Sequence, residues 1–270
     1  MSAVSGRDGR RGPWRVHGLS VEGYRHLRGG VPCQDAWHFA VTGPARDPVT
    51  VLAVADGAGS RPCSDKGAEL AARLATTHFG RRATPAFPGA DAVHDQLRAA
   101  FHDVREAFLR QTGDDADDYA TTLTVVVLAS TWVGHLSVGD GFVVLRAGVE
   151  DGQPQFHLLP QADAPSEYSN ETVFITTANA ESWLRTACVR DYAIDGVLLS
   201  TDGLAQIALS WRDGRPDRPN ESFAAAVFRS IDNPGHDPAG DDAALAELLR
   251  SDRFTAINAD DKTLLRAVRR

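Results

Sequence analysis

The sequence predicts an α+β fold in which two runs of antiparallel strands form a β-sandwich with helices on its flanks. Short apolar, β-branched segments follow one another with only short turns between them, which favours antiparallel neighbours over strands joined by helical crossovers. Two segments whose apolar residues recur at helical spacing separate the first run of strands from the second. The chain has 270 residues, 43% of them hydrophobic, which is enough for one substantial core, so we expect a single domain.

The first run of strands is joined by turns that contain glycine or proline. These strands are predicted at residues 16–21, 36–41 and 49–55. A helix should follow over residues 64–79, with Ser64 as its N-cap. A second, longer helix is predicted over residues 90–110, and its apolar side chains share one face. That face is made of Val93, Leu97, Ala100, Phe101, Val104 and Phe108.

The second run of strands begins after these two helices and is predicted at residues 121–129, 132–138 and 142–146. Gly139 and Gly141 would form a hairpin turn between the last two of these strands. Residues 150–181 are polar and contain three prolines, so we expect an irregular surface flap there. The remaining elements are predicted as strands at 185–189 and 197–200, helices at 204–209, 222–230 and 240–249, and a final strand at 263–268.

Composition and charge exclude several classes of protein. The formal net charge of −8 makes nucleic acid a poor partner. No apolar segment follows Met1, so we expect no secretory signal, and the longest apolar run, residues 123–129, is too short to cross a bilayer. We therefore expect a soluble, cytoplasmic protein with no membrane partner, made of a flexible tail over residues 1–13 and one domain over residues 14–270.

Three cysteines, Cys33, Cys63 and Cys188, are too few and too scattered for a disulfide framework. They fit a reducing cytoplasm. No CxxC motif or paired histidine spacing accompanies them, so we interpret them as small, half-buried thiols and not as ligands of a soft metal.

Acidic motifs distributed over nearly the whole chain are the candidate functional residues. They contain Asp35, Asp56, Asp202 and the pair Asp260 and Asp261, and each lies at the edge of an apolar, β-branched segment. Carboxylates that meet at the rim of a sheet repel one another unless cations lie between them, and sites made only of oxygen suit Mg²⁺ or Mn²⁺. The pattern therefore predicts a divalent-metal centre, although any one Asp-Gly pair taken alone is also a common turn former.

Five motifs resemble, in order, those of the metal-dependent protein phosphatases of type 2C, the PPM family. They are Asp56-Gly57-Ala58-Gly59, Ala120-Thr121-Thr122-Leu123, Val138-Gly139-Asp140-Gly141, Thr201-Asp202-Gly203 and Asp260-Asp261-Lys262-Thr263. The segment that ends in Cys33-Gln34-Asp35-Ala36 is similar to the bacterial branch of the family. The resemblance runs from about residue 16 to residue 268.

This resemblance implies a four-layer α-β-β-α sandwich, with helices outside two antiparallel sheets and two Mn²⁺ or Mg²⁺ ions at one end. It implies that Asp56 bridges both ions and that the Gly57 carbonyl binds one of them. Asp202 and Asp260 correspond to carboxylates that bind the other ion, and Asp35 to a residue that holds a metal through water.

Other positions follow from the same resemblance. Asp261 corresponds to a residue behind the ligands, but two adjacent aspartates leave the register between Asp260 and Asp261 open by one. Asp140 corresponds to a structural turn and not to a metal ligand. Asp117 matches an aspartate associated with a third, weaker metal, with Asp118 as the fallback, although an acidic run of this kind is usually a solvated loop.

The chain departs from the family pattern at two positions. Many members have a phosphate-binding arginine five residues before the aspartate that matches Asp35, and here that position is Gly30. We predict that Arg28 supplies the phosphate contact instead, because residues 27–32 read as a glycine-containing loop that could bend over the site. The position of a histidine in some members is Ala58 here, a loss that is common in bacterial members.

The predicted function is that of a metal-dependent serine/threonine protein phosphatase, with Asp56, Asp202 and Arg28 as catalytic residues. Two cations about 3.5–4 Å apart can bridge a water and lower its pKa, so a phosphomonoester is hydrolysed by direct attack of that metal-bridging water. We expect a monomer whose substrate is a phosphorylated protein and which opposes a serine/threonine kinase. The alternatives are a catalytically weak regulatory or phosphoprotein-binding module, which the missing arginine favours, and a hydrolase of a small phosphorylated molecule.

Overall fold

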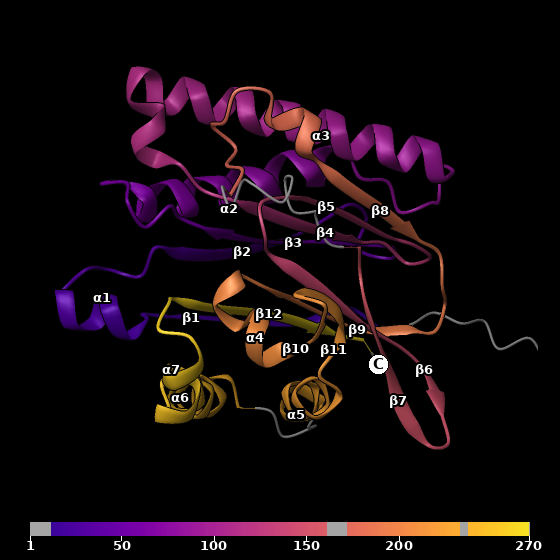
Figure 1. Ribbon diagram of the computed structural model, residues 1–270. Coiled ribbons are helices and arrows are strands. Elements are labelled where there is room, and N and C mark those ends of the chain that lie inside the picture. Colours follow the sequence, from indigo (N-terminus) through magenta and orange to yellow (C-terminus); the bar gives the residue numbers. More distant parts are fainter. Residues whose placement is uncertain (1–11, 161–171, 233–236, 270) are drawn as a thin grey trace, which may run out of the picture.

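The protein is described by a computed structural model over residues 12–160, 172–232 and 237–269. Two five-stranded antiparallel sheets face each other, and helices cover the outer face of each sheet (Figure 1). The predicted α+β fold, a four-layer α-β-β-α sandwich, is confirmed. Most of the predicted tail, residues 1–11, and part of the predicted flap, residues 161–171, lie outside the described residues.

The first sheet has the strand order β2-β3-β4-β5-β8, and every neighbouring pair in it is antiparallel. Its strands are β2 (Asp35–Thr42), β3 (Val49–Asp56), β4 (Leu123–Leu128), β5 (Val133–Val138) and β8 (Arg185–Val189). Two long helices, α2 (Ser64–Arg82) and α3 (Ala90–Thr112), cover its outer face (Figure 1). The predicted apolar face of α3 is confirmed, because all six of its residues are buried.

The second sheet has the order β1-β12-β9-β6-β7 and is also antiparallel throughout. Its strands are β1 (Arg15–Val21), β6 (Phe142–Glu150), β7 (Gln153–Leu158), β9 (Ile194–Ser200) and β12 (Lys262–Val268). Its outer face carries α4 (Ala205–Ala208), α5 (Glu221–Asp232), α6 (Pro238–Leu249) and α7 (Asp252–Ile257) (Figure 1). None of the helices in the described part of the chain is both long and apolar enough to cross a membrane.

The core lies in three apolar layers, one between the sheets and one beneath each set of helices. Strand β3 shows why its sequence is apolar throughout. Successive side chains of a strand point to opposite faces of the sheet, so Val51 and Ala53 pack in the helix layer while Leu52 and Val54 pack between the two sheets. Because both faces of the strand are buried, its sequence does not alternate between apolar and polar residues.

The predicted hairpin at Gly139 and Gly141 is wrong in its topology. Strands β5 and β6 belong to different sheets, so the connection between them crosses the sandwich. Gly139 has a positive φ of 95°, which explains why glycine is needed in this turn. At Gly141, a Cβ would lie 2.5 Å from the Thr124 hydroxyl, so the neighbouring strand leaves no room for a side chain.

Several short elements were not predicted. The loop after β1 contains the helix α1 (Tyr24–Gly29), and the predicted flap begins with β7, which pairs with β6. The predicted helix after Asp202 is only four residues long. It leads into an unpredicted hairpin made of β10 (Leu209–Arg212) and β11 (Arg215–Pro219). Another unpredicted helix, α7, follows α6, which was predicted to be the last helix. Short 3₁₀-helices also occur, η1 (Gly113–Tyr119), η2 (Ala180–Trp183) and η3 (Asp202–Leu204). Each is too short to show a clear periodicity.

The predicted cap of α2 is also wrong. Cys63 is the N-cap residue and makes no side-chain capping bond, whereas Ser64 is the first residue of the helix. The Ser64 hydroxyl donates instead to the Arg61 carbonyl at 3.1 Å.

Candidate metal centre

Three carboxylates that are far apart in the sequence meet at one end of the sandwich. Oxygens of Asp56, Asp140 and Asp202 all lie within 4.8 Å of one another. Asp56 is the last residue of β3, and Asp202 follows β9. Phe142 pairs with Ser200 where β6 lies beside β9, so Asp140 and Asp202 lie opposite each other just beyond the paired ends of these strands. The sheet topology therefore assembles the group.

The partial burial of Asp56 and Asp202, and the crowding of both with the exposed Asp140, make this group costly to ionise without a cation. Burial is the main cause that raises the pKa of Asp56, and the charges of Asp35, Asp202 and Asp140 raise it further. Burial, followed by the charges of Asp140 and Asp260, raises the pKa of Asp202 to about 6. Carboxylates that crowd together and disfavour one another's charge in this way fit an all-oxygen site for divalent cations, whose positive charge would relieve the repulsion.

The backbone of Asp56 is fixed by the Ala120-Thr121-Thr122 motif. The Asp56 carbonyl accepts hydrogen bonds from the Thr122 amide at 2.8 Å and from the Thr121 hydroxyl at 2.9 Å. The Asp56 amide donates to the Thr122 hydroxyl at 3.0 Å. These three bonds fix the backbone of Asp56. The motif therefore determines where its side chain leaves the strand.

Gly57 forms an antiparallel bridge with Thr121 that leaves its carbonyl available. The hydrogen bonds of this bridge run from the Thr122 amide to the Asp56 carbonyl and from the Ala58 amide to the Ala120 carbonyl, so the Gly57 carbonyl takes no part in them. A Cβ at Gly57 would lie 2.5 Å from the Ser64 carbonyl oxygen, so a side chain would not fit. This position can offer a backbone oxygen to a cation.

Asp35 is buried and is not a member of the group of three carboxylates. It is the first residue of β2 and lies opposite Asp56 in the strand register. The Thr201 hydroxyl donates to its carboxylate at 2.7 Å. Burial, followed by the charges of Asp261 and Asp202, raises the pKa of Asp35 well above its ordinary value. This arrangement suits a buried carboxylate that lies next to the metal ligands and is not one of the three grouped carboxylates.

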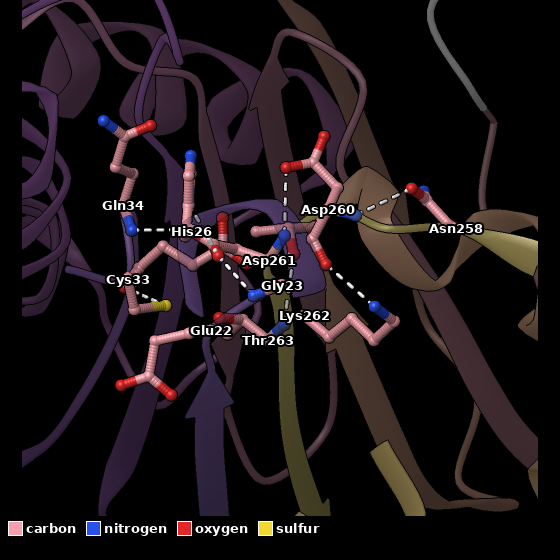
Figure 2. A network of polar contacts seen from close by, with 12 residues as sticks. Glu22, Gly23, His26, Cys33, Gln34, Asn258, Asp260, Asp261, Lys262 and Thr263 are labelled. Atoms are coloured by element: carbon pink, nitrogen blue, oxygen red, sulfur yellow. Dashed lines mark hydrogen bonds and ion pairs between the residues drawn. The ribbon is translucent and has the colours of Figure 1, made fainter. Parts of the chain in front are cut away.

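Asp260 and Asp261 occupy different environments (Figure 2). The Asp261 side chain is only 3% exposed, and its oxygens accept bonds from the amides of Gly23 and Gln34, both at 2.6 Å. His26 Nδ1 lies 2.9 Å from each of the two Asp261 oxygens. The Asp260 carboxylate is exposed and accepts the Asp261 amide at 2.9 Å, and its charge raises the pKa of Asp202. The geometry thus favours Asp260 as the residue that faces a cation.

Two residues of this centre were missed by the interpretation of the sequence. Asp140 lies in a turn, as expected, but its carboxylate also belongs to the group of three. Its Asp-Gly motif, which it shares with Asp56 and Asp202, was the available signal. His26, which contacts Asp261, has no such signal, because its partner is 235 residues away in the sequence.

Besides Asp35, three predicted site residues, Asp260, Asp117 and Arg28, are not members of the group of three carboxylates found in the described residues. Asp117 is exposed on η1, and its carbonyl accepts the Ala120 amide at 3.3 Å. Arg28 is exposed on α1, where its guanidinium donates to the Tyr24 hydroxyl at 3.2 Å and lies 5.6 Å from the centre of the Tyr24 ring. Half of the predicted flexible loop is therefore helical. The roles assigned to Asp117 and Arg28 stay predictions.

Comparisons with known proteins agree with this architecture. A family model described as protein phosphatase 2C matches residues 22–250. Serine/threonine-protein phosphatase 3 of Escherichia coli (strain K12) is 29% identical over 267 residues, which covers 94% of this chain and 98% of that protein.

Solved structures of phosphatases have the same fold. A serine/threonine phosphatase from S. agalactiae has a TM-score of 0.60 at 17% identity, over 95% of this chain and 99% of that chain. A serine-threonine phosphatase 2C from Toxoplasma gondii has a TM-score of 0.64 at 13% identity, over 95% of each chain. The catalytic domain of PstP, solved in complex with two manganese ions, has a TM-score of 0.56 at 19% identity, over 95% of this chain and 98% of that chain.

Proposed function

Because this chain belongs to the protein phosphatase 2C family and is a metal-dependent serine/threonine phosphatase, we propose that its carboxylates hold two Mn²⁺ or Mg²⁺ ions at the end of the sandwich. The observation that carries this proposal is the meeting of Asp56, Asp140 and Asp202 within 4.8 Å. Carboxylate and carbonyl oxygens are the donors that these cations prefer. The family and the retained carboxylates favour an enzyme over a regulatory module.

Each residue has a distinct task in this proposal. Asp56 would help to hold both cations, the Gly57 carbonyl would hold one of them, and Asp202 and Asp260 would hold the other. Asp140 adds negative charge beside Asp202, and Asp35 would help to hold a cation through water, with its carboxylate fixed by the Thr201 hydroxyl. Asp261 binds no cation.

Asp261 is a positioning residue. It ties the backbone amides of Gly23 and Gln34 to the start of β12. Gln34 in turn accepts the Gly57 amide through its own carbonyl at 2.9 Å, so this chain of bonds sets the positions of Asp35 and Gly57.

The chemistry follows from the charge of the substrate. When bound, the cations would supply the positive charge that a phosphate dianion requires and would lower the pKa of the attacking water. The protein contributes the fixed carboxylates, and Arg28 would bind the phosphate oxygens from α1. The substrates are phosphoproteins, and we further propose that the enzyme opposes a serine/threonine kinase, acts as a monomer in the cytoplasm and uses Asp117 to hold a third, weaker ion.

Phosphate release measured with a phosphothreonine peptide and with p-nitrophenyl phosphate tests this proposal. We expect turnover with added Mn²⁺ or Mg²⁺, none after EDTA treatment and desalting, and recovery when Mn²⁺ is restored. Asp56→Asn and Asp202→Asn should be inactive, whereas Glu150→Gln, at an exposed position of β6, should keep the wild-type rate. Full turnover after metal removal would refute the metal assignment. Turnover of p-nitrophenyl phosphate without any turnover of phosphopeptides would favour a small phosphorylated substrate.

A further inference from the structure

Helix α1 and the residues that follow it, 24–32, form an exposed segment that we name the α1 projection. No residue of α1 is buried, and of residues 24–32 only His26 is partly covered. A six-residue helix is not stable by itself in water, and surface helices normally bury one apolar face. The α1 projection buries none, so its packing does not explain its sequence.

The projection is held at its base and directed to solvent. Its base is tied to Asp261 by the Gly23 amide at 2.6 Å and by His26 Nδ1 at 2.9 Å. A Cβ at Gly23 would lie 2.3 Å from the carbonyl carbon of Asp260, so the base also presses against the backbone of a proposed metal ligand. Figure 1 places α1 at the end of the molecule where β2 begins. The projection therefore lies beside Asp260 and next to the carboxylate centre, by which we mean Asp260 together with the group of Asp56, Asp140 and Asp202.

Its exposed surface is both apolar and positively charged. Tyr24, Leu27 and Val31 are 48%, 61% and 38% exposed, which makes them three of the eleven exposed large hydrophobic residues in the described part of the chain. Arg25 and Arg28 are exposed on the same segment, and residues 23–34 contain no acidic residue although the whole chain has a net charge of −8. Tyrosine and arginine exposed together are typical of a binding surface.

We propose that the α1 projection docks an acidic segment with apolar residues that flanks the phosphorylated serine or threonine of a protein substrate. This inference rests on the proposed function. A phosphate placed at the carboxylate centre brings the flanking residues of the substrate over the projection, because its base adjoins Asp260. Arg25 then selects acidic flanks by charge complementarity, while Arg28 binds the phosphate, and Tyr24 and Leu27 contact apolar side chains.

Steady-state kinetics with matched phosphopeptides test the proposal. Three peptides would share one length and one phosphothreonine and would differ only in flanks that are acidic and apolar, neutral, or basic. With Mn²⁺, we expect kcat/KM to be about 3–10-fold higher for the acidic than for the neutral peptide, in the range of a few exposed charge contacts. Arg25→Ala and Leu27→Ala should remove most of this preference, and Arg25→Glu should shift it towards the basic peptide. In these variants, turnover of p-nitrophenyl phosphate, which has no flanking residues to contact Arg25 or Leu27, should stay within about twofold of wild type.

Two control variants lie on other surfaces. Arg98→Ala on α3 and Leu248→Ala on α6, both exposed, should keep the preference for the acidic peptide. Equal kcat/KM for the three peptides in the wild type, or a preference that survives Arg25→Glu, would overturn the docking proposal while leaving the proposed function intact. Arg25-dependent binding to phosphatidylserine vesicles without a peptide preference would overturn it in favour of a membrane surface. Absence of turnover on every substrate would contradict the proposed function, and the docking proposal with it.

Discussion

Asp261→Asn should destabilise the protein strongly, although the substitution changes only one atom of the side chain. The carboxylate is buried and accepts two backbone amides at 2.6 Å, those of Gly23 and Gln34. Asparagine presents an NH₂ group to one of these donors, which leaves one buried N–H without an acceptor. It also removes the charge that strengthens the other bond. A bond to a charged acceptor contributes about 1.5–3 kcal/mol, so we expect the free energy of unfolding to fall by about 3–5 kcal/mol.

Urea denaturation of the metal-free protein measures this loss, from the midpoint at an unchanged m value. His26→Ala is the matched comparison, because it removes only the third, partly exposed partner of Asp261 and should cost about 1 kcal/mol. Glu150→Gln, which has no such contacts, should leave the midpoint unchanged. A loss below about 1 kcal/mol in Asp261→Asn would refute the view that Asp261 holds the base of α1 and the start of β2 together.

Three further predictions concern single side chains. Arg28→Ala should lower kcat/KM by about 10–100-fold, mainly through KM, with unchanged Mn²⁺ affinity, and unaltered kinetics would show that the cations hold the phosphate without it. Asp117→Ala should lower turnover much more than it weakens tight Mn²⁺ binding. An unchanged rate across a full Mn²⁺ titration would show that Asp117 is a solvated loop residue without a role in metal binding. His135 is 2% exposed, and burial lowers its pKa from 6.5 to about 4, so the neutral ring is favoured in the folded state. Its contribution to stability should be present above pH 6.5 and decrease by about 3 kcal/mol as the pH falls to 4. Urea midpoints of the wild type and His135→Leu at pH 7.5 and pH 5 measure this, and parallel pH dependences in the two proteins would contradict it.

Much of the fold could be predicted from the sequence because its strands are apolar on both faces and its long helices are amphipathic. Strand β3 and the buried face of α3 are examples, since local spacing alone identifies them. Helix α1 was missed because it buries no side chain, so it has no apolar periodicity, and its Gly29-Gly30 pair is typical of a loop. The crossing from β5 to β6 could not be predicted, because strand pairing over long distances decides to which sheet a strand belongs.

The candidate site was predicted in part. The acidic motifs at the ends of strands indicated Asp56 and Asp202, which the structure brings together. Asp140 joins them only because β6 pairs with β9, a contact that no local pattern shows. The choice between Asp260 and Asp261 likewise requires tertiary contacts. The amides that bind Asp261 come from residues more than 220 positions earlier in the chain.

Calorimetric titration of Mn²⁺ into the metal-free protein tests the central claim, that Asp56 and Asp202 anchor a two-ion centre. We expect about two tightly bound ions per wild-type chain and per Glu150→Gln chain at pH 7.5. Asp56→Asn should lose tight binding and Asp202→Asn should lose at least one ion. Both metal-free variants should unfold at a temperature equal to or above that of the wild type, because each substitution relieves repulsion within the carboxylate group. Wild-type stoichiometry and affinity in Asp56→Asn would contradict the account.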